Sequence, residues 1–332
     1  MDTELFLKTI NADVVRFEHA MAEDLAVLKR QIDPQLYAVL EYGLQNGGKR
    51  IRPLLVILSA RLCGNRHGEV CRLALAFEYL HAATLFHDDV IDNAETRRGR
   101  PSINQRFGQV AAILAGDFLH ARSMRLVGQL AGTRGLEIFC EATAGMVNGE
   151  FLQLQNSTCQ SLSEEEYYQI VMGKTGFLIT AACEIGALYA GCSSEQQRAL
   201  HRYGEGLGVA FQMIDDLLDY LGESGKTGKA VGNDLHEGKL TLPVILALQR
   251  GSHGDVERLR GIFASVEDRA VHLAEVISLV RRYNGFDVTR SRAEDAIRSA
   301  VQQLAIFPDG DGNAGDKEIL TAIGNYILSR EK

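Results

Sequence analysis

The sequence contains the pattern Asp-Asp-x-x-Asp twice, at residues 88–92 and at residues 215–219. On a helix, the first and last aspartates of each pattern share one face, because residues four apart lie about one turn apart. Like charges at this spacing destabilise a bare helix by about 0.3 kcal/mol per pair, so a cation between them would account for the arrangement. Carboxylate oxygens suit Mg²⁺, which keeps several waters and completes its shell with phosphate oxygens.

Basic residues lie close to both acidic patterns and in one further segment. Arginine suits bidentate recognition of phosphate, and lysine acts as a point charge. Combined with the aspartates, these residues predict a site for more than one phosphate-bearing ligand. The segment GGKR lacks the spacing of a nucleotide P-loop, and no strand precedes it. The basic residues are Arg97, Arg98, Lys226, Lys229, Lys239, Lys49, Arg50 and Arg52.

One acidic pattern alone could equally be a solvated acidic surface, since such a match arises by chance at ordinary composition. Here there are two copies, each at the end of a strongly apolar segment and each followed by a basic loop. Their combination favours the metal site over the solvated surface.

The composition is that of a globular protein without a general affinity for polyanions. The 332 residues are 46% hydrophobic and 23% charged, and the net charge of −8 argues against nucleic acid and anionic membranes as partners. The six cysteines form no C-x-x-C pair and are expected to be reduced core residues. The first residues, MDTELFLKTI, do not resemble a signal peptide, so a cytoplasmic protein is expected. The apolar run at 176–192 is interrupted by Glu184 and predicts a buried core helix.

Long segments with apolar residues at helical spacing, and almost no strand-type alternation, predict an all-α protein. Asp33 and Pro34 have the positions of an N-cap and a first helical residue, and residues 72–92 continue without a breaker for more than five turns. The loops expected at 64–68, 93–102, 222–233 and 307–316 do not have the length or composition of an interdomain linker. The chain is therefore expected to form one helical domain over residues 1–332.

From GGKRIRP through the two acidic patterns to DLHEGKLTLPVI, the chain resembles the trans-isoprenyl diphosphate synthases of the polyprenyl synthetase family. The resemblance implies the isoprenoid synthase fold, an antiparallel helix bundle around a deep central cavity, as a homodimer. It also implies about three Mg²⁺ ions held by the two aspartate motifs, and two substrates, isopentenyl diphosphate and an allylic diphosphate.

The resemblance also implies a role for individual residues, and catalysis is assigned to Asp88, Asp92, Asp215, Lys174 and Lys229. The metal ligands are Asp88, Asp92 and Asp215, with Asp89, Asp216 and Asp219 as secondary ligands or supports. Isopentenyl diphosphate is assigned to Lys49, Arg52, His81 and Arg98. The allylic diphosphate is assigned to Arg97, Lys174, Thr175, Gln212, Lys229 and Lys239.

The less obvious assignments can also be weighed from the residues alone. His81 could be a core histidine, but it lies seven residues before Asp88 and so on the same helical face, which favours the site. Lys174 and Thr175, in MGKTGFL, could mark a simple helix interruption, and their assignment comes mainly from the resemblance. Gln212 lies one turn before Asp216, which is compatible with a polar role at the cavity mouth.

The charges indicate a reaction in which diphosphate leaves an allylic carbon. Mg²⁺ and the basic residues would stabilise the departing diphosphate, while apolar walls exclude the water that would trap the cation. The resemblance implies that the double bond of isopentenyl diphosphate then attacks, and that the released diphosphate accepts the proton.

The length of the product is expected to depend on Ala83 and Thr84, which lie about one turn before Asp88. In the family resembled, bulky residues there form a floor, and small ones let the chain pass. The small residues predict a long-chain product, octaprenyl or between hexaprenyl and decaprenyl, for a quinone side chain. The alternative is that both are small only because two helices approach closely there.

Other functions remain open at this stage. The chain could make short farnesyl or geranylgeranyl products, or it could be a non-catalytic subunit of a heteromeric prenyl synthase, although both acidic motifs are intact. A metal phosphohydrolase with His87 as a ligand would leave the second acidic motif unexplained.

Overall fold

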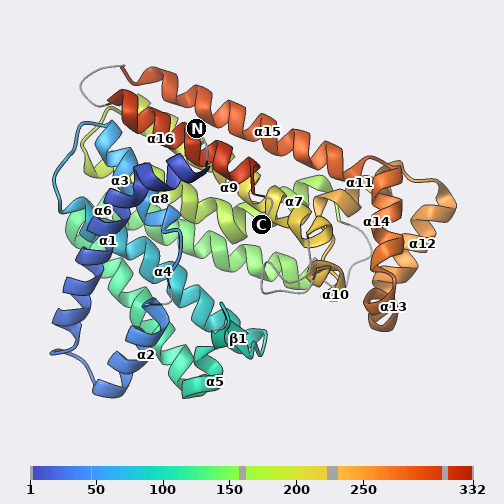
Figure 1. Ribbon diagram of the computed structural model, residues 1–332, viewed down its shortest axis with the longest axis horizontal. Helices are drawn as coiled ribbons and strands as arrows, with labels where there is room; N and C mark the ends of the chain where they lie inside the picture. Colours follow the sequence, from blue (N-terminus) through green and yellow to red (C-terminus); the bar gives the residue numbers. More distant parts are fainter. Residues whose placement is uncertain (1–2, 46, 157–161, 223–230, 309–312, 331–332) are drawn as a thin grey trace. The chain divides into compact units, whose positions relative to one another are not determined.

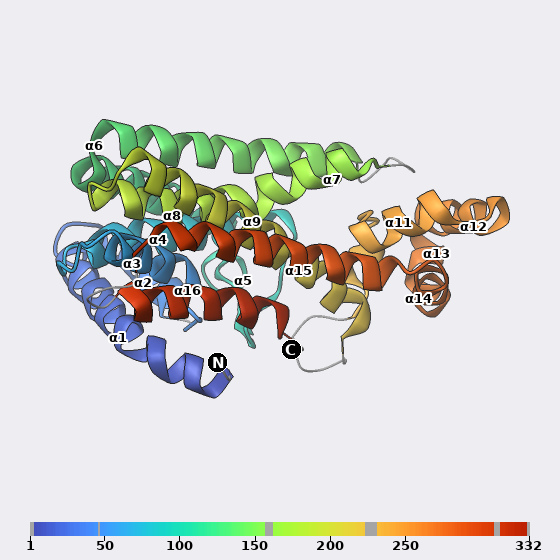
Figure 2. The same ribbon diagram turned by 90° about the horizontal axis from the view of Figure 1, so that it is seen from above.

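In the computed structural model, which describes residues 3–45, 47–156, 162–222, 231–308 and 313–330, the chain is almost wholly helical (Figures 1 and 2). The all-α expectation is confirmed. The first helices are α1 (Thr3–Leu28), α2 (Pro34–Leu44), α3 (Ile51–Leu62), α4 (Val70–Ile91), α5 (Ile103–Phe107), α6 (Gln109–Asn156), α7 (Glu164–Val171), α8 (Phe177–Tyr189) and α9 (Ser194–Leu221). They are followed by α10 (Asn233–His236), α11 (Leu242–Arg250), α12 (His253–Ala264), α13 (Val266–Val271), α14 (Leu273–Arg282), α15 (Gly285–Gln303) and α16 (Asn313–Leu328).

The helix α6 is kinked at Gly132, which has a φ of 66°, and two short described stretches have other helical geometries. A π-helical turn, η1 (Met172–Gly176), connects α7 to α8, and a 3₁₀ turn, η2 (Leu304–Ile306), follows α15. π-turns inside helices are uncommon and are frequent at functional sites. The interruption suggested by MGKTG is therefore a widening of the helix and not a break.

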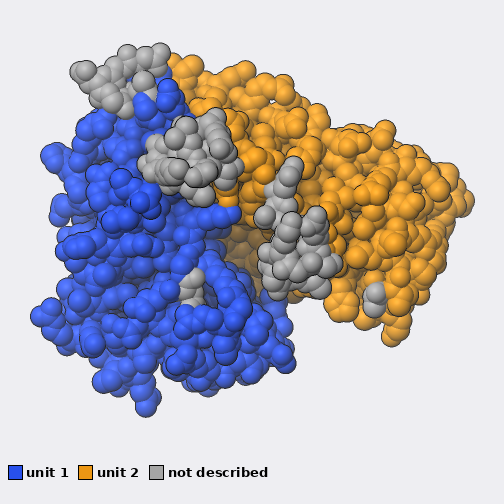
Figure 3. Space-filling model, in the orientation of Figure 1, with its two compact units in different colours: residues 1–141, 181–201, 306–320 blue, residues 142–180, 202–305, 321–332 orange. Residues whose placement is uncertain are grey.

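The chain forms two compact units, each made of segments distant in sequence (Figure 3). Unit 1 consists of residues 1–141, 181–201 and 306–320, and unit 2 of residues 142–180, 202–305 and 321–332. The expectation of one domain over the whole chain stays a prediction.

The core of unit 1 is built on α3 and α4, which pack against each other and against α1. Almost every residue of α3 from Pro53 to Leu62 is buried, as expected for the central helices of a bundle. Phe77 of α4 meets Phe139 edge to face, with ring centroids 5.5 Å apart. This packing fixes the carboxyl end of α4, where the first acidic motif lies.

The core of unit 2 includes the second half of α9 and the helices α11, α14 and α15. Helix α11 packs against α14 and against α15. Two pairs of glycines let the backbone of η1 approach its neighbours. A Cβ atom on Gly173 would lie 2.4 Å from the Cα of Gly149 in α6, and one on Gly208 in α9 would lie 2.6 Å from the Cα of Gly176. Side chains cannot fit there, so η1 is held closely between α6 and α9.

Local signals predicted several element boundaries. The side chain of Asp33 accepts hydrogen bonds from the backbone N–H groups of Gln35 (2.8 Å) and Leu36, and Pro34 is the first residue of α2, as expected. The predicted continuous helix over 72–92 is α4. Ser163 and Glu166 form a capping box at the start of α7.

The loop expected at 93–102 contains a small antiparallel hairpin of β1 (Thr96–Arg97) and β2 (Arg100–Pro101). Its two central residues, Arg98 and Gly99, have φ values of 53° and 74°. Positive φ at both positions matches the right-handed twist of a tight hairpin, which explains why a strand pair forms where the sequence shows only a loop.

One described segment, Glu164–Tyr189, is long and apolar enough to cross a membrane by composition, but 72% of its most apolar window is buried inside the protein. This burial agrees with the expectation of a core helix at 176–192.

Candidate active site

The first acidic motif ends α4 in unit 1, and its members differ in exposure. Asp92 is exposed at the C-cap of the helix, Asp88 is half-buried, and Asp89 is buried. The Nε of Arg97 in β1 donates a hydrogen bond to the carboxylate of Asp89 at 2.6 Å. Burial raises the pKa of Asp89, and the Arg97 partner opposes this effect. The hairpin therefore places Arg97 against the carboxyl end of α4, the helix that precedes it.

A pocket in unit 1 lies beside this motif and is lined by basic groups. Its lining includes Arg50, His81, Arg97 and Arg98, together with Asp89. Burial lowers the pKa of His81 well below its usual value, and the positive charges of Arg52, Arg98, Arg97 and Arg50 lower it further. The His81 ring is therefore neutral at pH 7 and lies in a strongly positive field, as an anion-binding site requires.

The segment GGKRIRP supplies three cations to unit 1 in different settings. Arg50 is buried, has a φ of 51°, and forms an ion pair with Glu78 and a hydrogen bond to the carbonyl of Leu44 (3.1 Å). Burial lowers the pKa of Arg52, against the charge of Glu78, and its Nε is buried without a hydrogen-bond partner among the described residues. Lys49 is exposed, one residue before Arg50.

The second acidic motif lies on α9 in unit 2, and its first member is the most exposed. The side chain of Asp215 is 50% exposed, and Nη2 of Arg330 lies 3.1 Å from its Oδ1. The Arg330 guanidinium also stacks on the ring of Phe211, 4.5 Å from its centroid. This arginine could not be predicted from the sequence, because its distance along the chain from α9 leaves no local signal.

The last member of the motif, Asp219, supports the neighbouring helix. Its two carboxylate oxygens accept hydrogen bonds from the backbone N–H groups of Asn233 (3.1 Å) and Asp234 (2.9 Å) at the start of α10. This contact satisfies N–H groups that a helix leaves unpaired at its beginning.

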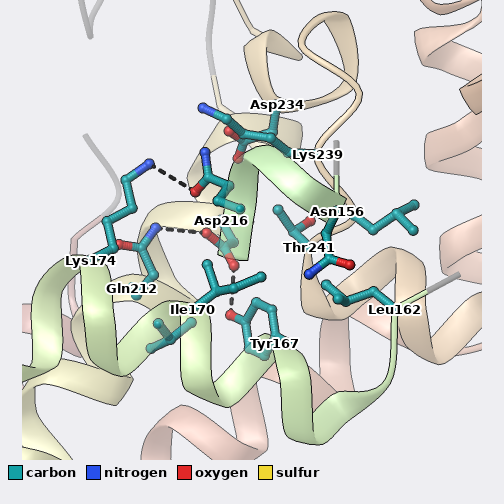
Figure 4. Close-up of a pocket in the computed structure, with 13 residues that line it drawn as sticks. Asn156, Leu162, Tyr167, Ile170, Lys174, Gln212, Asp216, Asp234, Lys239 and Thr241 are labelled. Atoms are coloured by element: carbon teal, nitrogen blue, oxygen red, sulfur yellow. Dashed lines mark hydrogen bonds between the residues drawn. The ribbon is translucent and has the colours of Figure 1, made fainter. Parts of the chain in front are cut away.

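The middle member, Asp216, is buried and bonded through both oxygens (Figure 4). The hydroxyl of Tyr167 donates to Oδ2 at 2.6 Å, and Nε2 of Gln212 donates to Oδ1 at 2.9 Å. Burial and the negative charge of Asp234 raise the pKa of Asp216 to about 8. Neither Tyr167 nor Asp234 was predicted, although Asp234 lies within the quoted DLHEGK segment.

A second pocket, in unit 2, opens beside Asp216 and carries two lysines. Nζ of Lys174 donates to the side-chain oxygen of Gln153 at 3.3 Å, and Lys239 forms an ion pair with Glu237. Burial and the charge of Asp219 raise the pKa of Asp234 to about 6, while Lys239 and Lys174 oppose this shift. Figure 4 shows both lysines and Asp234 around the same opening.

Of the remaining predicted residues, those that the structure describes lie in helices. Ala83 is buried in α4, and the hydroxyl of Thr84 donates to the backbone carbonyl of His81 at 2.9 Å. Thr175 is buried, and its hydroxyl donates to Oε1 of Gln212 at 2.9 Å. Lys229 and Lys226 lie outside the described residues.

Residues 33–280 match the profile of the family described as polyprenyl synthetase. The chain belongs to the polyprenyl synthetase family. It is 36% identical to the octaprenyl diphosphate synthase of Escherichia coli over 94% of this chain and 97% of that protein. It is 34% identical to a short chain isoprenyl diphosphate synthase of Methanothermobacter thermautotrophicus, over 96% of this chain and 98% of that one.

A solved structure of a polyprenyl synthase from Caulobacter crescentus, complexed with calcium and isoprenyl diphosphate, superposes with a TM-score of 0.86. It is 34% identical and covers 100% of this chain and 98% of that chain. The protein is thus a prenyltransferase, a trans-prenyl diphosphate synthase with the isoprenoid synthase fold, as the family resemblance of the sequence implied.

The donor set of this polyprenyl synthetase fits the divalent cation that the family uses. Among the described residues no three His, Cys, Asp or Glu side chains gather closely enough to enclose a metal. Asp88 and Asp92 share one face at the end of α4, and Asp215 is half-exposed. Such open carboxylates suit Mg²⁺, which takes few protein ligands and completes its shell with substrate phosphates.

The hydrolase hypothesis required a metal bound by His87. Nε2 of His87 lies 3.2 Å from the backbone carbonyl oxygen of Ile113 and 3.5 Å from Oδ1 of Asp117, and both residues belong to α6. The histidine therefore belongs to the contact between α4 and α6.

Proposed function

We propose that the protein is a long-chain trans-polyprenyl diphosphate synthase, most like octaprenyl diphosphate synthases, that extends an allylic primer with successive isopentenyl diphosphates. The main support is the small pair Ala83 and Thr84 on α4, one turn before the aspartates. An octaprenyl relative that covers almost the whole chain adds to it. A long polyprenyl product fits use as a quinone side chain, and we keep the cytoplasm as the expected compartment.

We assign the diphosphate of isopentenyl diphosphate to the basic pocket of unit 1. Arg98 and His81 line it, Arg52 offers a buried Nε, and Lys49 lies in the adjoining segment. A neutral His81 can donate one hydrogen bond to a phosphate oxygen without adding charge. The arginines then supply the positive charge that holds the diphosphate.

The allylic diphosphate is assigned to the pocket of unit 2, and Arg97 of the hairpin keeps the assignment to this substrate that the family resemblance implies. Lys174 and Lys239 supply its cations, and Lys229 belongs to the same set by its place in the sequence. Positive charge there stabilises the diphosphate as it leaves, so these lysines act on the step in which charge develops. Apolar lining residues such as Ile170 and Leu240 exclude water from the reacting carbon.

Asp88, Asp92 and Asp215 are the proposed ligands of about three Mg²⁺ ions, which would supply Lewis acidity toward the departing diphosphate. Asp89, Asp216 and Asp219 are the proposed supports, because each already holds an arginine, a side-chain network or a helix start. The released diphosphate accepts the proton lost after condensation.

A homodimer is the proposed assembly. In unit 2, α6 exposes Val147, Phe151 and Leu154, which are spaced three and four residues apart and so share one face. A face of this kind is typical of a subunit interface.

The deciding experiment incubates the purified chain with Mg²⁺, farnesyl diphosphate and excess isopentenyl diphosphate, and resolves the products by chromatography. We expect a product near eight isoprene units. A product that stops at farnesyl or geranylgeranyl length would support the short-chain alternative. No product from the chain alone, with activity restored by a second subunit, would identify a heteromeric component.

The division of the basic residues has its own test. Arg98→Ala is expected to raise KM for isopentenyl diphosphate more than for the primer, and Lys239→Ala the reverse, because the two side chains line different pockets. Equal effects on both substrates in both variants would contradict the assignment.

A further inference from the structure

Three side-chain hydrogen bonds form a continuous chain beneath the pocket of unit 2. Thr175 donates to Gln212 (2.9 Å), Gln212 donates to Asp216 (2.9 Å), and Tyr167 donates to the other oxygen of Asp216 (2.6 Å). Tyr167, Thr175 and Asp216 are each no more than 5% exposed. The chain of bonds links α7, η1 and α9 through polar groups that are removed from water.

Each member of this network has its hydrogen-bonding direction determined by its neighbour. The amide nitrogen of Gln212 donates to Oδ1 of Asp216, so its amide oxygen faces Thr175 and accepts the hydroxyl proton. The hydroxyl proton of Thr175 therefore points to Gln212, which itself lines the pocket. The cation that η1 presents to the pocket is Lys174, the residue next to Thr175.

Burying a carboxylate is costly unless hydrogen bonds compensate it, and a partly satisfied buried network is less stable than a complete one. Tyr167 is the terminal donor, and it comes from a helix that carries none of the predicted site residues. Without its hydroxyl, Oδ2 of Asp216 would lose the donor that Tyr167 supplies, and the carboxylate could rotate. Gln212 and then Thr175 would lose their fixed orientation in turn.

We propose that Tyr167 is a positioning residue for the allylic diphosphate: through Asp216 and Gln212 it fixes Thr175, and with it the π-helical turn that presents Lys174. The inference depends on the proposed function of this pocket. It also gives Gln212 and Thr175 a supporting role beneath the pocket, beside the contact role that the family resemblance implies.

The test compares Tyr167→Phe with Tyr168→Phe, a matched control on the same helix. Tyr168 is the next residue, its ring packs edge to face on Tyr167 at 5.7 Å, and it is not among the residues that line the pocket. The probe is farnesyl S-thiolodiphosphate, an allylic analogue that ionises slowly, and its Kd is measured by calorimetry with Mg²⁺. We expect Tyr167→Phe to raise this Kd and the KM for the primer about tenfold, the scale of one lost hydrogen bond to a charged group. The KM for isopentenyl diphosphate and the values for Tyr168→Phe should stay within about twofold.

A double-mutant cycle with Thr175→Val supplies a readout that a purely structural role would not give. Among the described residues, the side chains of Tyr167 and Thr175 are joined by hydrogen bonds through Asp216 and Gln212, so coupling between their effects on the analogue's Kd reports on this network. We expect the double variant to have about the same Kd for the analogue as the single variant with the higher Kd. Additive effects, or equal effects of Tyr167→Phe on both substrates, would overturn the proposal.

The same measurements separate this inference from the proposed function. Wild-type protein that neither binds the analogue nor makes product would contradict the proposed function itself. Wild-type protein that does both, with Tyr167→Phe indistinguishable from Tyr168→Phe, would contradict only the role of Tyr167. If Tyr167→Phe fails to fold, as judged by circular dichroism, Thr175→Val alone must raise the analogue's Kd for the network to be retained.

Discussion

At the scale of single residues, each acidic motif divides into carboxylates that hold the protein together and carboxylates that face outward. Asp89, Asp216 and Asp219 are engaged by Arg97, by Tyr167 with Gln212, and by backbone N–H groups. Asp92 and Asp215 are exposed. The spacing predicted both motifs, but this division depends on partners distant in sequence, such as Tyr167, and no local pattern reports them.

The carboxylates proposed as metal ligands should carry the activity. Asp88→Asn and Asp215→Asn are each expected to lower kcat by about 10²-fold or more at saturating Mg²⁺, because each removes a group that stabilises the departing charge. Asp117→Asn, an exposed aspartate on α6, is the control and should retain activity. Near-normal turnover in either motif variant, with helicity intact, would contradict the ligand assignment.

Glu184, the charge that interrupts the apolar run of α8, has a structural function within unit 1. It accepts hydrogen bonds from His201 (2.7 Å) and Gln197 (3.0 Å). Burial raises its pKa, but the bonds to His201 and Gln197 outweigh this effect, so the pKa lies below its usual value. A carboxyl group of this kind stabilises the folded state above its unfolded pKa of about 4.5, and this contribution is lost as pH falls through the lower folded value.

We therefore expect Glu184→Gln to lower the free energy of unfolding by about 2 kcal/mol at pH 7. The difference from wild type should shrink below about pH 4.5, where the carboxylate of the unfolded chain becomes protonated. Urea unfolding at several pH values measures the loss of unfolding free energy and its dependence on pH. Substitution of the exposed Glu195, Glu195→Gln, is the control. A difference that does not change with pH would show that the ionised form of Glu184 contributes nothing.

At the scale of elements, helices were predictable and their close approaches were not. Apolar periodicity and the cap at Asp33 marked α2 and α4, since these signals are local. The π-turn η1 depends on glycines of α6 and α9 that pack so closely against it that an added Cβ atom would lie within 3 Å of the facing backbone. This is a tertiary condition that the sequence of η1 alone does not contain. The hairpin was not predicted because Arg98 and Gly99, and not the usual Asn-Gly pair, occupy the two turn positions with positive φ.

Gly173→Ala should disturb this packing. Its methyl group would meet the Cα of Gly149 at 2.4 Å, so η1 must shift and Lys174 with it. We expect a loss of about 1–3 kcal/mol in stability and a higher KM for the primer. Gly261→Ala in α12, where the added methyl meets nothing within 4 Å, should instead stabilise the protein by about 0.5–1 kcal/mol. Thermal unfolding of the two variants checks both signs.

At the scale of the whole molecule, product length is the property that the fold does not determine, since relatives with octaprenyl and short-chain products match the chain over nearly its full length. Ala83→Tyr is expected to shift the product to farnesyl or geranylgeranyl diphosphate while the first condensation continues, because under the proposed function a bulky ring at this position would block the growing chain. Chromatography of the products measures the shift. A long product from the variant would show that Ala83 does not line the chain's path and is small only because helices pack closely there.

The buried ion pairs of unit 1 bear on how the protein is made in the cell. Arg61 of α3 pairs with Asp13 (2.8 Å) and hydrogen-bonds Asp316 (2.6 Å), and both carboxylates are at most 4% exposed. During translation, Asp13 and Arg61 leave the ribosome long before Asp316. Asp316 lies in the segment 306–320, which belongs to the same unit. Closing so long a loop is slow, and burying an incompletely paired charge is unfavourable until it closes. Unit 1 therefore cannot complete its folding until the segment 306–320 has left the ribosome, and until then its N-terminal helices keep apolar faces open to chaperones.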